Sequence, residues 1–234
     1  YSEKPLGVAY GEAAALPIQG ERTAMWRDLN GLRPHRPMVL AFPEGGWDEL
    51  VPEAGLACRD DLARQWERSL RGDVFRHEMI GDDYPMTADF NVRPVVHVGD
   101  FGLTEVRRRT SDRGSYVWDA PVKSRDDLPG LHVRSVDVDH AETARRVELA
   151  NEILGDILRV RAHGLLWWSV GLTVFLVHLR GLQQVMLDMY DDPQLVHELM
   201  ALLRDDMAGM MDRCEAEGVL WLNSGPNDYV GSGG

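Results

Sequence analysis

The stretch MVLAFPEGG (Met38–Gly46) joins a short apolar run to an abrupt stop. The run Met38–Phe42 is continuously apolar, and it is bounded by Pro37 and Pro43, which lack the backbone donor that regular structure needs. An apolar run without polar alternation is typical of a strand that is covered on both faces, as in a parallel sheet. The stretch therefore predicts a buried parallel strand whose carboxyl end is marked by Glu44.

Amphipathic helices are predicted around this strand, because apolar residues recur at helical spacing over several long segments. These segments are Glu21–Leu32, Arg59–Leu70, Asp139–Val160 and Leu172–Tyr190, the last interrupted near Arg180-Gly181. A further helix is predicted to begin at Asp192-Pro193 and to end at Gly218, with the aspartate as N-cap and the proline as the first helical residue.

Other apolar runs predict further buried strands at 74–80, 164–169 and 219–223, and Val92–Val98 and Ser115–Trp118 look extended. Strands that alternate with long helices indicate a parallel α/β protein. Periodicity alone leaves two architectures open, a closed barrel and an open doubly wound sheet. Residues 1–20 contain Pro5 and Pro17 and are predicted to form an arm with little structure of its own.

Composition limits the partners of the 234-residue chain. Lys plus Arg number 25 and Asp plus Glu number 38, so the net charge is 25 − 38 = −13. An acidic surface repels phosphate backbones and anionic lipids, so we expect neither nucleic acid nor a membrane surface as partner. Cys58 and Cys214 stand alone, which suits two reduced thiols and a cytoplasmic location. No apolar run approaches the ~20 residues of a membrane span.

Polar residues at the ends of the predicted strands form the candidate site, because catalytic residues of parallel barrels come from the carboxyl ends of strands. The predicted catalytic residues are Glu44, Asp82 and Asp83, since neighbouring carboxylates in a partly apolar cleft supply a general acid or base near neutral pH. The predicted substrate contacts are Trp168, Asn223, Ser224, Asp228, Tyr229 and His97. Each has an ordinary alternative: a plain turn or loop for the polar stretches, and a structural role for His97 and His178.

Two stretches together resemble the uroporphyrinogen decarboxylase superfamily. In Val170–Pro193 a Gly-containing strand end precedes a helix, the turn Arg180-Gly181, a second helix and an Asp-Pro start, and Leu29–Pro37 is similar to the family's opening segment. The resemblance implies a TIM or (β/α)₈ barrel, with 1–20 as an arm and 21–234 supplying about five of its eight strands. The chain is then expected to be one portion of a longer polypeptide and inactive alone.

The same resemblance implies two chemistries. The superfamily contains porphyrinogen decarboxylases, which use no cofactor, and zinc-dependent methyltransferases that act with corrinoid proteins or methylated thiols. By order along the chain, Asp82 or Asp83 falls near the decarboxylase aspartate that contacts pyrrole nitrogens, and Ser224 falls near a substrate-contacting serine. Any zinc ligands of the methyltransferase kind would lie beyond Gly234, so no metal site is expected within the chain.

Two departures from the decarboxylase pattern favour the methyltransferase-like branch. The family's arginine-rich clamp for substrate carboxylates is replaced by the segment around Glu44, and its catalytic tyrosine falls near Val177. We therefore expect an enzyme that acts on a small substrate or on a corrinoid or thiol methyl carrier, with a corrinoid protein or a second copy of the chain as partner. Porphyrinogen-type decarboxylation and a non-catalytic binding subunit stay open as alternatives.

Overall fold

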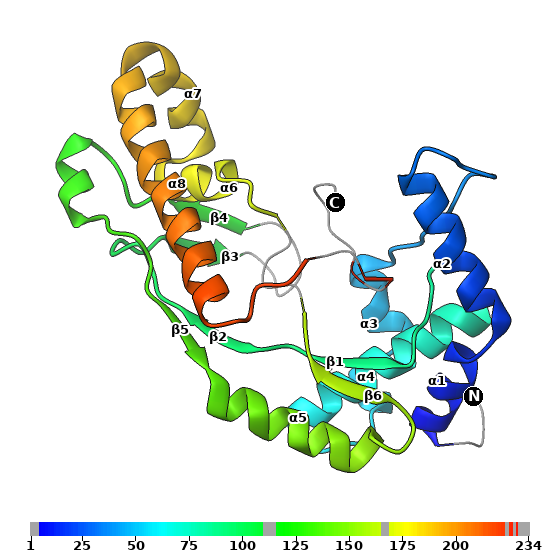
Figure 1. Ribbon diagram of the computed structural model, residues 1–234. Helices are drawn as coiled ribbons and strands as arrows, with labels where there is room; N and C mark the ends of the chain where they lie inside the picture. The colour runs from blue at the N-terminus through cyan, green and yellow to red at the C-terminus, as the bar shows by residue number, and fades with distance from the viewer. Residues whose placement is uncertain (1–4, 110–115, 165–168, 223–224, 227, 229–234) are drawn as a thin grey trace. The chain divides into compact units, whose positions relative to one another are not determined.

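The computed structural model describes residues 5–109, 116–164, 169–222, 225, 226 and 228. The chain divides into two compact units, and each is described by itself. Unit 1 comprises Tyr1–Val92, Ala144–Ala162 and Asn223–Tyr229. Unit 2 comprises Arg93–Thr143, His163–Leu222 and Val230–Gly234. Figure 1 labels their helices and strands.

Unit 1 is largely helical. Its α-helices are α1 (Leu6–Ala14), α2 (Pro17–Asn30), α3 (Trp47–Leu50), α4 (Asp61–Phe75) and, from Ala144 on, α5 (His140–Leu154). Its short helices are η1 (Glu44–Gly46), η2 (Glu53–Gly55) and the π-helix η3 (Arg76–Ile80). The Asp60 side chain caps α4 by accepting the backbone N–H groups of Leu62 and Ala63. At the other end, η3 stops at Gly81, whose φ of 65° favours glycine.

A parallel pair of strands and three helices share the core of unit 1. Strand β1 (Asp89–Val92) pairs in parallel with β6 (Arg159–Ala162), which follows α5. The buried core residues come from α1, α4, α5, β1 and the segment leading into β1, and they include Tyr10, Leu70, Val74, Met86, Phe90, Val92, Ala150 and Leu154. The core therefore holds one face of α4 in place, and this helix carries the candidate site described below.

Unit 2 contains two antiparallel strand pairs. Strand β2 (Val95–Val98) pairs with β5 (Val136–Asp139), and β3 (Val106–Arg109) pairs with β4 (Tyr116–Asp119). A six-residue 3-10 helix, η4 (Arg125–Gly130), begins with a capping box in which Ser124 and Asp127 satisfy each other's backbone donors.

Three helices complete unit 2: α6 (Thr173–Arg180), α7 (Leu182–Asp191) and α8 (Pro193–Ala216). Their buried faces meet in a core that consists of Val122, Leu176, Leu179, Val185, Leu195, Leu199 and Leu203. Gly181 separates α6 from α7 with a φ of 85°, and Asp192 caps α8 by accepting the N–H of Leu195. The predicted interruption at Arg180-Gly181 and the predicted Asp-Pro helix start are therefore both confirmed.

The predicted (β/α)₈ barrel is wrong. The described residues form three separate sheets of two strands each, and only β1 and β6 run parallel. The segments 38–42 and 219–222 are not strands, and 74–80 belongs to the end of α4 and to η3. Most of the predicted strand 164–169 and residue 223 lie outside the described residues. Small sheets of this kind cannot close into a ring of parallel strands, so the described residues do not form a five-strand part of a barrel.

Side-chain carboxylates, not a neighbouring strand, accept from two backbone N–H groups of the apolar run 38–42. The Val39 N–H donates to Asp83 Oδ2 over 2.9 Å, and the Ala41 N–H donates to Asp82 Oδ2 over 2.8 Å. The Asp83 N–H in turn donates to the Val39 carbonyl over 2.9 Å. None of the five residues is buried, and Val39 and Phe42 are 59% and 48% exposed, so the predicted strand is wrong in its burial as well as in its pairing. Its apolar composition therefore gave the wrong secondary structure.

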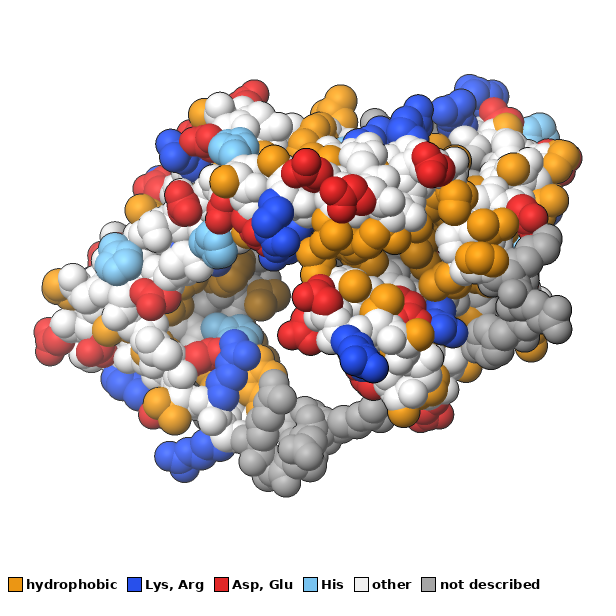
Figure 2. All heavy atoms as spheres, turned by 90° about the horizontal axis from the view of Figure 1, so that it is seen from below, with side chains coloured by type: hydrophobic (Ala, Val, Ile, Leu, Met, Phe, Trp, Pro, Cys, Tyr) orange, Lys and Arg blue, Asp and Glu red, His pale blue; other side chains and the backbone are white. Residues whose placement is uncertain are grey.

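The helix predictions were more accurate, since each predicted helix overlaps an observed one, but the predicted helix Asp139–Val160 is too long, because α5 ends at Leu154 and β6 begins at Arg159. Extended backbone near 92–98 and 115–118 is confirmed by β1, β2 and β4. The segment 1–20, expected to be an arm with little structure, contains α1 and the start of α2. Figure 2 shows one face, on which acidic, basic and hydrophobic side chains are interspersed. Within the described ranges, no helix has both the length and the apolar character needed to cross a membrane.

Candidate functional site

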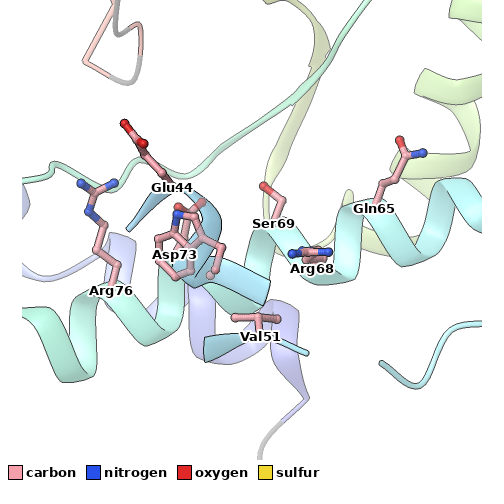
Figure 3. A pocket seen from close by; sticks show the side chains of 9 residues that line it. Glu44, Val51, Gln65, Arg68, Ser69, Asp73 and Arg76 are labelled. Carbon is pink, nitrogen blue, oxygen red and sulfur yellow. The ribbon is translucent and has the colours of Figure 1, made fainter. Parts of the chain in front are cut away.

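Unit 1 holds a cavity of about 540 Å³ between one face of α4 and the segment that contains η1 and α3 (Figure 3). Its walls are Glu44, Trp47, Val51, Gln65, Arg68, Ser69, Gly72, Asp73 and Arg76. The α4 residues among them recur every three or four positions, which places them on the same side of the helix. Because the adjacent face of α4, with Leu70 and Val74, is anchored in the core, this row of polar groups is held in place.

Asp73 is the chemically distinctive group of the cavity. Burial raises the pKa of its carboxyl group to about 6, and the nearby positive charge of Arg76 opposes the rise only in part. Within the described part of the chain, no group donates a hydrogen bond to this carboxylate. A carboxyl group that titrates near neutral pH can both accept and release a proton, which is the property of a general base or acid.

Arg76 is fixed by partners on several sides. Its Nε lies 2.8 Å from Asp82 Oδ2, and its Nη2 donates to the Ala41 carbonyl over 2.5 Å. The guanidinium also lies over the rings of Tyr84 and Phe42, at 4.3 Å and 5.4 Å from their centroids. Both charged side chains are nearly buried, at 9% and 4% exposure, so the positive charge of Arg76 is largely matched by Asp82.

The second cavity arginine is also neutralised. Arg68 pairs with Glu53 over 3.0 Å and with Asp48, so it too has acidic partners of its own. Glu44 has no ion pair with a described residue, and its backbone lies in the left-handed region with a φ of 48°. Such a conformation is strained for a residue with a side chain and is frequent at functional sites. The carboxylates of Glu44 and Asp73 thus give the cavity uncompensated negative charge.

Trp47 forms the aromatic wall of the cavity. Its ring packs against α4 at Gly72, and it meets Phe75 edge to face with centroids 6.4 Å apart. The face of an indole ring attracts cations through its quadrupole. The cavity therefore combines two features that favour a positively charged ligand, an aromatic wall and unmatched carboxylates.

The three predicted catalytic carboxylates lie in unit 1 but have different environments. Glu44 lines the cavity, and Asp82 is connected to it through Arg76. Asp83 accepts two hydrogen bonds from Arg36, which are the main reason why its pKa falls to about 2. A carboxylate held in this way stays ionised and fixes the segment around Arg36 in place, so its geometry indicates a structural role.

The predicted substrate contacts are only partly brought together. Asp228 accepts the N–H of Gly225 over 2.9 Å. Its charge adds to burial and to the charges of Asp73 and Asp82 in raising the pKa of Tyr84, so it lies in the same acidic neighbourhood. His97 is exposed on β2 of unit 2 and does not line this cavity. The other predicted contacts lie outside the described residues: Trp168, Asn223, Ser224 and Tyr229.

The sequence reasoning missed Asp73 and Arg76. Both lie within or next to the segment 74–80, which was predicted to be a strand. A signal was present, since Asp73 follows Leu70 by three residues and therefore continues the apolar face of the predicted helix Arg59–Leu70. A carboxylate on the apolar face of a helix is unusual, and this position marks Asp73 as a candidate functional residue.

Two further observations bear on the site. No cluster of three or more metal-ligating side chains occurs among residues that the structure describes. Comparison with protein-family models, with curated proteins and with solved structures found no match. The geometry of the cavity is therefore the observation from which a function can be inferred.

Proposed function

We propose that the protein is a small-molecule enzyme of the methyltransferase-like kind that the resemblance implies, with Asp73 as its proton acceptor. The observation that carries the proposal is the Asp73 carboxyl group, whose pKa of about 6 lies near the working range of a general base. It faces a cavity of about 540 Å³, which falls in the usual size range of small-ligand sites.

The substrate that best suits this cavity is a small primary amine in its protonated form. Arg68 and Arg76 are matched by acidic partners, whereas Glu44 and Asp73 are not, so an ammonium group would find net negative charge. The Trp47 ring would cover its carbon atoms and add a cation–π contact. The same charge would repel a substrate with several carboxylates, which places porphyrinogen-type decarboxylation second.

Asp73 then prepares the amine for methyl transfer. The carboxylate takes one proton from the ammonium group, so an N–H bond breaks and its electron pair stays on nitrogen. A corrinoid or a methylated thiol would supply the methyl group, and its bond to that group would break with the electron pair left on the carrier. Without a base near the nitrogen the amine would stay protonated and unreactive at neutral pH.

The test uses propylamine as probe and methylcobalamin as methyl donor. Calorimetric titration should show propylamine binding to the unchanged chain, and Asp73→Asn should weaken it by about 10-fold or more, as for loss of a hydrogen bond to a charged group. Mass spectrometry should find N-methylpropylamine only where Asp73 is present. The matched control is Asp212→Asn, an exposed aspartate of α8, which should behave like the unchanged chain.

Two outcomes would contradict the proposal. Equal propylamine affinity in the unchanged chain and in Asp73→Asn would show that the cavity does not recognise the ammonium group. Tight binding without any methylated product from methylcobalamin or a methylated thiol would remove the methyltransferase-like reaction and leave only the binding site.

A further inference from the structure

Unit 2 holds a cavity of its own, with a volume of about 480 Å³. It lies between the 99–107 segment and α6, and its polar lining includes Glu105, Arg107, Arg134 and His178. None of these residues belongs to the unit 1 site, so an inference drawn from them stands independently of the proposed function.

Glu105 and His178 form an oriented acid–base pair. The Nδ1 atom of His178 lies 2.7 Å from Glu105 Oε2, and Glu105 also pairs with Arg107. Burial alone would raise the pKa of Glu105, but the hydrogen bonds from His178 and Arg107 outweigh it and lower the pKa. Because an ionised carboxylate is acceptor only, it fixes the proton on Nδ1 and leaves Nε2 of the neutral ring as an acceptor.

Aromatic neighbours hold the imidazole ring in one orientation. The His178 ring stacks on Trp118, with centroids 5.0 Å apart and an interplanar angle of 13°, and Tyr116 lies 6.4 Å away. In the parts of the chain that are described, no group hydrogen-bonds to Nε2 of His178. A histidine that lines a cavity and is held by a carboxylate and a stacked ring is preorganised to receive a proton from a ligand.

The remaining walls suit an aromatic ligand. Phe101 and Phe175 meet edge to face with centroids 5.9 Å apart, and Leu103 and Val174 add further apolar surface. The Arg134 guanidinium lies 4.6 Å from the centroids of both phenylalanine rings. Aromatic rings pack favourably against such walls. Arg107 and Arg134 have carboxylate partners of their own, Glu105 and Asp206, and Asp100 adds a further acid to the lining, so a ligand that binds in neutral form suits this cavity.

We propose that this cavity binds a neutral aromatic hydroxyl compound, which gives its hydroxyl proton to Nε2 of His178. The O–H bond breaks, the N–H bond forms, and the electron pair stays on the oxygen. The imidazolium charge is stabilised by Glu105, and the phenolate oxygen stays paired with the new N–H group at Nε2. The site is therefore an activation site for a phenolic nucleophile.

The probe for this proposal is 4-nitrophenol, because its phenolate absorbs visible light and its neutral form does not. Titration of the full chain into 4-nitrophenol, at a fixed pH below that at which the free compound ionises, should raise the phenolate absorbance to saturation. His178→Phe keeps an aromatic ring against Trp118 but removes the base, so the rise should disappear. Glu105→Gln removes the charge that balances the imidazolium, and the bound phenolate fraction should fall about 10-fold, as for one pKa unit.

The controls separate proton transfer from folding. His197→Phe makes the same change at an exposed position of α8 that does not line the cavity, and it should leave the absorbance rise intact. Circular dichroism of each variant checks the fold, and Glu105→Gln decides the matter if His178→Phe does not fold. An undiminished rise in either folded variant, or no rise with the unchanged chain, would overturn the proposal.

Discussion

Each unit has an arginine that lines its cavity, lies over two aromatic rings and pairs with a buried aspartate. In unit 1 this is Arg76 with Asp82, and in unit 2 it is Arg134 with Asp206. The two cavities differ in the hydrogen bonding of a carboxylate that lines each of them, Asp73 in unit 1 and Glu105 in unit 2. Asp73 receives no hydrogen bond from a described residue, whereas Glu105 receives one from His178 and one from Arg107.

The difference shows that donors, more than burial, set the protonation of these carboxylates. Burial raises the pKa of both groups, but only Asp73 ends above its ordinary value. Glu67 of α4, less than two turns from Asp73, behaves in the same way as Glu105. It is buried, yet the N–H groups of Ala57 and Cys58 and the side chain of Arg71 bring its pKa to about 2. Helix α4 thus carries Asp73, to which no described residue donates a hydrogen bond, and Glu67, which accepts several.

Arg134→Met should have the largest effect, because it gives unit 2 a buried carboxylate without its cation. Asp206, whose side chain is 2% exposed, would keep only the backbone N–H of Arg134 among its present donors. Breaking a buried pair from one side costs about 3–5 kcal/mol of unfolding free energy. Urea unfolding measures the loss. The control, Arg204→Met on the exposed face of α8, should cost far less, and equal losses would contradict the comparison.

Asp73→Asn should change stability in the opposite direction. The folded pKa of about 6 exceeds the ordinary 3.8, so the folded protein binds this proton more tightly than the unfolded chain does. Its stability therefore falls as the pH rises from about 4 to about 6, by at most about 3 kcal/mol. The asparagine variant lacks this slope and should be more stable than the unchanged chain at pH 7.

Unfolding curves at several pH values test the Asp73 prediction. The difference between the variant and the unchanged chain should grow across the interval from the ordinary pKa to about 6 and stay constant above it. Asp212→Asn, on the exposed face of α8, should show no such growth. A variant that is less stable at pH 7 would mean that the Asp73 carboxylate has a partner that stabilises its charge.

Glu67→Gln should have the smallest effect of the three and should sharpen the contrast within α4. The pKa of Glu67 lies below its ordinary 4.5, so its contribution is present above that value and is lost as the pH falls toward 2. The amide keeps one acceptor oxygen but loses the charge, so the expected cost at pH 7 is about 1–2 kcal/mol. The loss of unfolding free energy should become smaller as the pH falls toward 2. A loss that is independent of pH would contradict the lowered pKa of Glu67.

Local sequence rules predicted the helices of this chain well. The Asp192-Pro193 start, the interruption at Gly181 and the apolar faces of α4 and α5 follow from capping, glycine conformation and periodicity, which depend on neighbours along the chain. Of the candidate site, the sequence supplied Glu44 and Asp82. It missed Asp73 because the residues after Leu70 were predicted to leave the helix.

What the sequence determined by itself is therefore the position of the helices α2, α4, α5, α6, α7 and α8, but not of α1 or α3, and the acidic character of the chain. Only the tertiary structure decided how the apolar run Met38–Phe42 pairs its backbone and which carboxylates have donors. An apolar run predicts burial, yet Val39 and Phe42 are exposed, and nothing in the letters of the run says whether a strand or the distant Asp82 and Asp83 will accept from its N–H groups. The pKa of Asp73 depends likewise on groups that meet it only after folding.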